Sequence, residues 1–354
     1  MDQRDGNKSR QDGAGLLDRL AAGPVVCAEG YLFELERRGY LQAGAFVPEV
    51  VLEHPEQVSA LHEQFVHAGS DVVEAFTYYA HREKLRLIGQ EHLLEPMNTT
   101  ALALAREVAK RHGALLAGNV CNTNIYDPSD PATGDQVRAM FTEQVQWAAD
   151  AGVDFVIAET IRYVGEAEIA LEAIRAADLP AVVTLVVDRD DLMRDGPPLI
   201  EAAKRLAGAG ADVVGLNCAR GPATMAPLLA GLVEALDVPV AALPVPYRTT
   251  PAQPTMQSLT DPAAPDDGRA FPTALDPFTC NRYEVASFTA QAAQDGVRYF
   301  GLCCGAAPHH VRAMAEALGR TPPASRYSAD MSKHVYLGTD PGLAAHNREY
   351  RTRL

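Results

Sequence analysis

Short apolar runs alternate with longer stretches of helical periodicity along most of this chain. The runs are rich in Val, Ile, Leu and Ala, which is typical of parallel strands that are buried on both faces. We expect strands near residues 24–30, 70–76, 114–119, 153–159, 180–186, 211–218, 238–243 and 297–303. We expect helices between them, near residues 55–68, 99–111, 136–150, 165–177, 199–209, 225–236 and 281–295.

Several of the predicted helices end in a glycine directly before the next strand, at Gly69, Gly152 and Gly210. Glycine is a common stop after a helix because it adopts the left-handed conformation without strain. An alternating series of eight strand–helix units favours an α/β fold of the closed (β/α)8 TIM-barrel type, with an open doubly wound sheet as the alternative. No Gly-x-Gly-x-x-Gly follows the first strand, so the dinucleotide-binding form of the open sheet lacks its fingerprint.

The chain divides into three predicted parts. Residues 1–14 are polar and charged, and we expect a mobile N-terminus there because so few apolar side chains cannot offset the entropy of ordering. The barrel is expected over residues 15–320, with a long loop after the seventh strand, residues 244–279, that closes over the site. Residues 321–354 have little periodicity, and we predict a C-terminal arm that lies across a partner subunit in a homo-oligomer.

Composition narrows the classes of function. The 354 residues are 47% hydrophobic and carry a formal net charge of -15, so there is no basic stripe to neutralise the phosphates of a nucleic acid. We find neither an apolar run long enough to span a bilayer nor the apolar core of a signal peptide near Met1. Six cysteines are too sparse for a disulfide scaffold of this length. We therefore expect a soluble, cytoplasmic protein that binds small molecules rather than nucleic acid or membranes.

Three cysteines stand at the ends of two predicted strands. Cys218 ends the run that begins at Val213, and Cys303 and Cys304 end the run that begins at Tyr299. In a barrel of this kind the chemistry lies at the carboxyl ends of the strands, so these thiols are candidates for one site. Three thiolates can bind Zn²⁺ and leave open the fourth position that a catalytic zinc needs. Core packing, a closed structural zinc site and a redox disulfide are the alternatives for the same residues.

Polar residues at the ends of the other predicted strands complete the candidates. They are Glu29, Thr77, Tyr78, Tyr79, Asn119, Asn122, Glu159, Thr160, Thr184 and Asn217. A carboxylate buried at a strand end without a partner is costly, so we expect Glu29 and Glu159 to face a cationic group of a ligand. A buried ion pair or a helix cap is the alternative for both acids.

Two motifs carry a family resemblance. Gly-Leu-Asn-Cys at 215–218 and Gly-Leu-Cys-Cys-Gly at 301–305 resemble the zinc-binding signature of the homocysteine S-methyltransferase family. The resemblance runs from about Leu16 to Ala324, is closest to the betaine-dependent branch, and includes residues 33–40, 53–56 and 76–80. It implies a (β/α)8 barrel in which Cys218, Cys303 and Cys304 bind zinc, and the zinc holds the homocysteine thiolate.

The resemblance also implies which residues bind homocysteine. Glu159 matches the family glutamate that meets the amino group, and the loop at Gly30 matches the one whose backbone amides hold the carboxylate. This chain has Ala28-Glu29-Gly30 where the family commonly has Asp-Gly-Gly, so the acid has moved by one position.

The methyl donor is implied in the same way. Tyr79, Tyr78 and Phe46 match an aromatic enclosure that attracts a trimethylammonium group by cation–π interaction. The expected reaction is transfer of a methyl group from glycine betaine to homocysteine, giving methionine and dimethylglycine. S-methylmethionine and dimethylsulfoniopropionate are the alternative donors, because aromatic faces attract sulfonium and ammonium groups alike.

Overall fold

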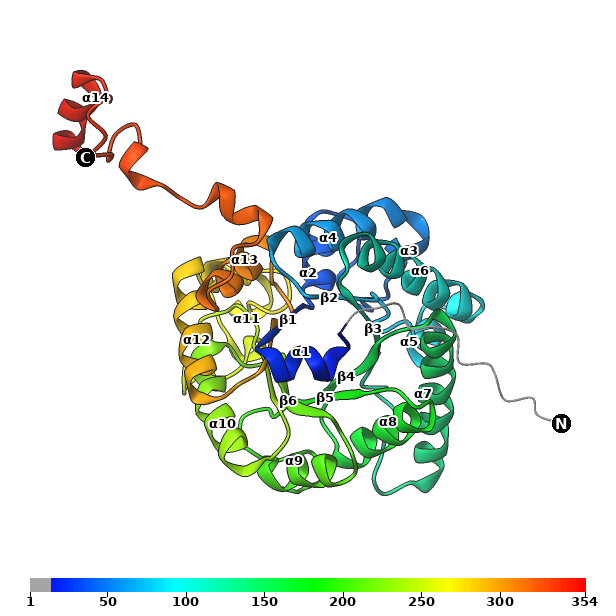
Figure 1. Ribbon diagram of the computed structural model, residues 1–354. Coiled ribbons are helices and arrows are strands. Elements are labelled where there is room, and N and C mark those ends of the chain that lie inside the picture. Colours follow the sequence, from blue (N-terminus) through cyan, green and yellow to red (C-terminus); the bar gives the residue numbers. More distant parts are fainter. Residues whose placement is uncertain (1–13) are drawn as a thin grey trace.

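Eight parallel strands close into a barrel in the computed structural model, which describes residues 14–354 (Figure 1). They follow one another in chain order, and β1 pairs with β8 from Val25 opposite Tyr299 to Ala28 opposite Leu302. The strands are β1 Val25–Ala28, β2 Val72–Glu74, β3 Leu115–Cys121, β4 Phe155–Ile161, β5 Ala181–Leu185, β6 Val213–Asn217, β7 Val240–Leu243 and β8 Tyr299–Leu302. The predicted (β/α)8 barrel is confirmed, and closure between β1 and β8 excludes the open sheet.

Helices surround the barrel (Figure 1). The larger ones are α4 Pro55–Ala68, α6 Leu94–His112, α7 Pro131–Ala151, α8 Val164–Ala176, α9 Leu199–Gly208, α10 Pro222–Ala235, α12 Arg282–Asp295 and α13 Pro308–Ala317. The smaller ones are α1 Leu16–Ala22, α2 Tyr31–Arg37, α3 Val50–Glu53, α5 Arg82–Leu87, α11 Pro265–Gly268 and α14 Ala345–Tyr350. Helices α7 and α10 begin before the predicted residues, because Pro131 and Pro222 are preorganised for the first helical position.

The barrel interior and one of its ends are filled by apolar side chains. Inward residues such as Val25, Phe155 and Tyr299 form one buried cluster, which also contains Leu16 and Leu20 of α1. Helix α1 lies across the barrel at the amino-terminal ends of the strands (Figure 1). The end available for a ligand is therefore the opposite one, where the strands reach their carboxyl ends.

The segment between β7 and α12, residues 244–281, is anchored against the loop that follows β8. Tyr247 is fully buried, and its hydroxyl accepts a hydrogen bond of 2.8 Å from Arg37. Arg37 also donates to the carbonyl of Gly305 at 3.2 Å. A side chain at position 305 would collide with the hydroxyl of Tyr247, so only glycine fits there. The segment is thus tied at its base to the loop that carries Cys303 and Cys304, while its closure over the site stays a prediction.

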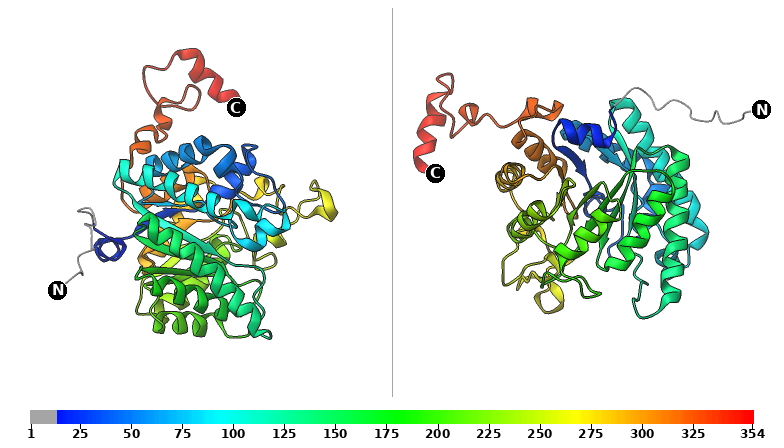
Figure 2. Two further views of the ribbon diagram at one scale, coloured as in Figure 1. Left: turned by 90° about the vertical axis from the view of Figure 1, so that its right-hand side faces the viewer. Right: turned by 60° about the horizontal axis from the view of Figure 1, so that its bottom comes forward.

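The chain leaves the barrel after α13, and residues 321–354 extend away from it (Figures 1 and 2). This C-terminal segment exposes large apolar side chains, namely Tyr327, Met331, Val335, Tyr336, Leu337, Tyr350 and Leu354. At the other end, the segment predicted to be mobile falls almost wholly on residues 1–13, which lie outside the described residues. Within residues 14–354, no helix combines the length and apolar character that crossing a membrane requires.

Candidate metal and substrate site

The three predicted cysteines meet at the carboxyl end of the barrel. Cys218 directly follows β6, and Cys303 and Cys304 directly follow β8. The sulfur of Cys304 lies 3.9 Å from that of Cys218 and 3.8 Å from that of Cys303, and all three sulfurs lie within 4.8 Å of one another. Sulfurs placed about 2.3 Å from one tetrahedral ion lie about 3.8 Å apart. The spacing of the thiols therefore fits a zinc ion.

The backbone at the site is held in a conformation that few residues other than glycine adopt. Cys218, Thr160, Tyr79 and Phe46 have φ angles of 57°, 60°, 62° and 57°. Positive φ at non-glycine residues costs free energy and is found preferentially at functional sites. Cys218 and Thr160, beside the thiol cluster and Glu159, are thus held in place at an energetic cost, as are Tyr79 and Phe46, which do not line the cavity.

The pKa values of the three thiols depend on one another. Hydrogen bonds from Cys303 and Cys304, aided by the positive charge of Arg162, lower the pKa of Cys218 well below the usual value of a thiol. The same interaction with Cys218 raises the pKa of Cys303 and of Cys304. The protonation of each thiol therefore depends on the other two. A divalent cation bound here would displace their protons, because metals bind the thiolate form.

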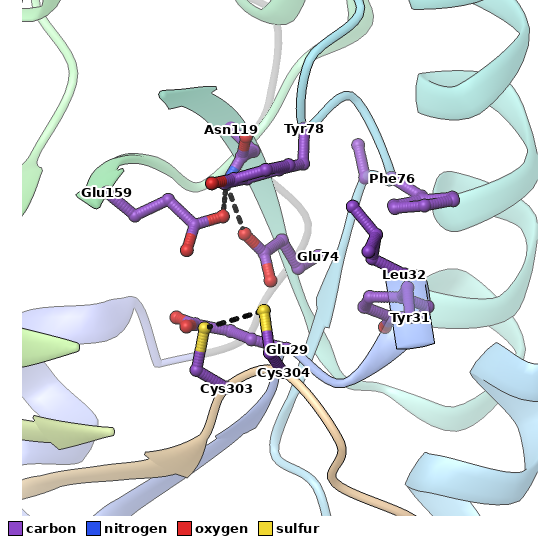
Figure 3. Close-up of a pocket in the computed structure, with 11 residues that line it drawn as sticks. Glu29, Tyr31, Leu32, Glu74, Phe76, Tyr78, Asn119, Glu159, Cys303 and Cys304 are labelled. Carbon is purple, nitrogen blue, oxygen red and sulfur yellow. Dashed lines mark hydrogen bonds between the residues drawn. The ribbon is translucent and has the colours of Figure 1, made fainter. Parts of the chain in front are cut away.

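A cavity opens beside the thiols (Figure 3). It is lined by Glu29, Tyr31, Leu32, Glu74, Ala75, Phe76, Tyr78, Asn119, Glu159, Cys303 and Cys304. Its walls are aromatic and aliphatic, and its polar groups are three carboxylates, one amide, two thiols and two tyrosine hydroxyls. The combination of sulfur ligands with buried acids suits a small ligand that carries both a thiol and a positive charge.

Glu159 is buried in β4 and lines the cavity. Its carboxylate accepts hydrogen bonds from the Nδ2 atoms of Asn119 at 2.6 Å and Asn217 at 2.7 Å, and from the hydroxyl of Thr160 at 3.2 Å. Burial raises the pKa of Glu159 to about 7, although the bond from Asn119 acts in the opposite direction. Since Asn217 precedes Cys218, one strand end positions both a partner of this acid and a thiol.

Glu29 and Gly30 occupy the turn between β1 and α2. Neither carboxylate oxygen of Glu29 has a hydrogen-bond partner although the side chain is buried, and burial raises its pKa well above the usual value. Gly30 is required for packing, because a Cβ there would lie 2.5 Å from the carbonyl oxygen of Ala306. Glu29 lines the cavity, whereas Gly30 brings the first and last loops of the barrel together.

The structure brings only one of the three predicted donor-site aromatics into the cavity. Tyr78 lines it, and the Tyr79 ring packs against Tyr78 with centroids 4.3 Å apart. The ammonium of Lys84 lies 3.9 Å from the centroid of the Tyr79 ring, so that ring already binds a cation of the protein. Phe46 packs against Phe33 at 5.7 Å between centroids and does not line the cavity.

Five lining residues were not predicted as ligands: Tyr31, Leu32, Glu74, Ala75 and Phe76. The four uncharged residues carry no signal of their own, but Glu74 is a charged residue at the end of the buried strand Val72–Glu74. A charge in a buried strand is unusual enough to mark a candidate, because such a side chain is rarely buried unless it is paired. That signal could have identified Glu74.

Comparisons with known proteins identify the family of this chain. The model of the family described as homocysteine S-methyltransferase matches residues 28–318. S-methylmethionine–homocysteine S-methyltransferase of Pongo abelii is 35% identical over 96% of this chain and 92% of its own length. Betaine–homocysteine S-methyltransferase 1 of Danio rerio is 37% identical over 96% of this chain and 86% of its own.

A similar fold is found in the metallated form of the homocysteine methyltransferase MmuM from Escherichia coli. Its TM-score is 0.66, with 20% sequence identity over 84% of this chain and 98% of that one. At this identity the likeness supports the fold alone. The match to the family model and the identity to relatives over nearly the whole chain carry the assignment: this chain belongs to the homocysteine S-methyltransferase family.

Proposed function

We propose that this protein is a zinc-dependent enzyme that transfers a methyl group from glycine betaine to L-homocysteine, giving L-methionine and dimethylglycine. The observation that carries the proposal is the cluster of Cys218, Cys303 and Cys304, which borders a cavity with buried carboxylates. Thiol ligands for a metal and acids for an ammonium group lie side by side. Homocysteine carries both matching groups.

Zinc held by the three cysteines would supply the nucleophile, because coordination deprotonates a thiol whose ordinary pKa is near 8.5. The protein's own groups would place the substrate. Glu159 would accept a hydrogen bond from the ammonium group of homocysteine, and Asn217 would hold that carboxylate in place through its 2.7 Å bond. In the transfer, a sulfur–carbon bond forms and the carbon–nitrogen bond of betaine breaks. The electron pair stays on the nitrogen of dimethylglycine, so no redox cofactor is needed.

The donor is the first prediction. Betaine is supported by the 37% identity to a betaine-dependent relative and by the aromatic wall at Tyr78. S-methylmethionine is the second candidate, because a relative named for that donor is 35% identical. Zinc-loaded enzyme with homocysteine is given betaine, S-methylmethionine or dimethylsulfoniopropionate in separate reactions, and methionine formation is measured. We expect the highest kcat/KM with betaine. A higher value with either sulfonium would overturn the choice of donor and leave methyl transfer to homocysteine intact.

Assembly is the second prediction. We propose a homo-oligomer in which the C-terminal segment, residues 321–354, covers part of another subunit. Its exposed apolar side chains, such as Tyr336 and Leu337, support this, since a partner would remove them from water. Light scattering at micromolar concentration should give a mass above that of one chain, and a chain ending at residue 320 should give a smaller assembly. A monomeric full-length protein would contradict the proposal.

We also place the protein in the cytoplasm. All six cysteines, which lie within the described residues, are free thiols. A reducing compartment would keep the thiols of the metal cluster from oxidation to disulfides.

A further inference from the structure

Glu74 is bridged to Glu159 by one amide group. Glu74 is 3% exposed, and its Oε1 atom accepts a hydrogen bond from Nδ2 of Asn119 at 2.5 Å. The same Nδ2 donates to Oε1 of Glu159 at 2.6 Å. An amide NH₂ has two N–H donors, so both of those in Asn119 hold carboxylates. The two acids are thereby fixed side by side on the wall of the cavity (Figure 3).

Glu29 completes a group of three carboxylates. A carboxylate oxygen of Glu29 lies within 4.8 Å of one of Glu74, in a group with the sulfur of Cys27. A carboxylate oxygen of Glu29 also lies within 4.8 Å of one of Glu159, in a group with the sulfur of Cys303. Glu29, Glu74 and Glu159 are thus neighbours in every pairing, and both oxygens of Glu29 are without a hydrogen-bond partner.

The cavity lacks a positive charge of its own. Among the described residues that line it there is no arginine or lysine. Buried carboxylates without a countercharge are costly, and the cost is relieved when a cation binds between them. The ligand is therefore the natural source of that cation.

The number and spacing of acceptors fit one type of cation. A primary ammonium group has three N–H donors, whereas a quaternary ammonium has none. Acceptors about 2.9 Å from one nitrogen in a tetrahedral arrangement are about 4.7 Å apart. An oxygen of Glu29 lies within 4.8 Å of one of Glu74, and an oxygen of Glu29 lies within 4.8 Å of one of Glu159, so each of these pairs fits such an arrangement. Glu74 and Glu159 retain lone pairs for a further bond after their bonds to Asn119.

We infer that Glu74 is a specificity-determining residue: together with Glu29 and Glu159 it holds the primary ammonium group of homocysteine and selects thiols that carry a free amino group. The inference rests on the proposed function, because homocysteine is taken as the thiol substrate. It assigns the quaternary group of the donor to a different part of the site, since three carboxylate acceptors offer it no hydrogen bond.

The test compares two thiols in calorimetric binding to the zinc-loaded full chain without a methyl donor. L-homocysteine carries the amino group, and 4-sulfanylbutanoate is the same molecule without it. Glu74→Gln keeps the shape of the side chain and an acceptor for Asn119 but removes the charge. We expect it to weaken binding of L-homocysteine roughly 10- to 100-fold, because a charged hydrogen bond is lost. Binding of 4-sulfanylbutanoate should change less than about twofold.

Controls separate this effect from a loss of structure. Glu83→Gln removes a surface carboxylate that pairs with Arg86, and should alter neither affinity. If Glu74→Gln does not fold, Glu74→Asp replaces it in the test. This variant retains the charge but shortens the side chain, and it should still weaken the binding of L-homocysteine more than that of 4-sulfanylbutanoate. An unchanged ratio of the two affinities in either variant would overturn the inference while leaving the proposed reaction standing. If the wild type binds L-homocysteine but forms no methionine from betaine, only the proposed donor is refuted. If the wild type binds no L-homocysteine, both the proposed function and this inference are refuted.

Discussion

Replacing Cys218, Cys303 or Cys304 with alanine is expected to remove both the bound zinc and the methyl transfer. Each sulfur is one of three that lie within 4.8 Å of one another, and the loss of one leaves two ligands for an ion that takes four. We expect about one zinc per chain in the wild type, close to none in each variant, and at least a ~1000-fold fall in methionine formation, because the nucleophile is no longer activated. Elemental analysis and a methionine assay measure the two quantities.

Cys280→Ala is the matched control for the cysteine variants. Cys280 is also a buried thiol, but it lies before α12 and outside the cluster, and its contact with His310 is made by its backbone carbonyl. This variant should keep its zinc and its activity. Full activity in any one of the three cluster variants would refute the metal site. If the variants lose their zinc and the wild type transfers no methyl group, the structural-zinc alternative is favoured instead.

Asn217→Asp is expected to lower kcat/KM for homocysteine by roughly 30- to 1000-fold, which corresponds to about 2–4 kcal/mol. The amide of Asn217 donates to Glu159 at 2.7 Å and to the hydroxyl of Thr160 at 2.8 Å, and its oxygen accepts from the backbone N–H of Thr160 at 2.9 Å. Aspartate keeps the shape but replaces the donor with an oxygen. Two buried carboxylates then face each other, and Glu159 loses a bond that holds it in the cavity.

Steady-state kinetics with varied homocysteine, together with zinc analysis, measures the effect of Asn217→Asp. Zinc should be retained, because all three sulfur ligands are still present, although the variant also loses the 3.8 Å bond from Nδ2 of Asn217 to the sulfur of Cys303. Asn281→Asp serves as the isosteric control: Asn281 caps α12 by accepting from the backbone N–H groups of Tyr283 and Glu284, and an aspartate can do the same. Asn217→Asp activity within about threefold of the wild type would show that the link to Glu159 does not position the substrate.

Local patterns were sufficient to predict the barrel and the thiol cluster. Apolar runs and glycine stops report on neighbours in the chain, and a repeated strand–helix unit has few ways to bury both faces of its strands. A parallel barrel then places every strand's carboxyl end at one face, so Cys218 and Cys303 meet although they are far apart in sequence. The chain's similarity to known methyltransferases added the homocysteine chemistry to that geometry.

The course of a loop could not be predicted in the same way. Phe46 matches a family aromatic, yet it packs against Phe33 and stays out of the cavity, while Tyr31 and Phe76 line it. Tyr31 and Phe76 also stack on each other, with centroids 5.5 Å apart. Loop conformation depends on contacts with several other elements, and short-range periodicity carries no record of them.

The sequence by itself determined the elements, their order and the three thiols at the strand ends. Only the tertiary structure decided which acids share the cavity. Glu74, Asn119 and Glu159 lie on three successive strands, and the register, with Glu74 opposite Ala117 and Cys121 opposite Glu159, brings them onto one wall. Glu29 joins them because β1 closes the barrel beside β2. Strand register and barrel closure are set by packing between distant segments, so this convergence of charge is a property of the folded chain.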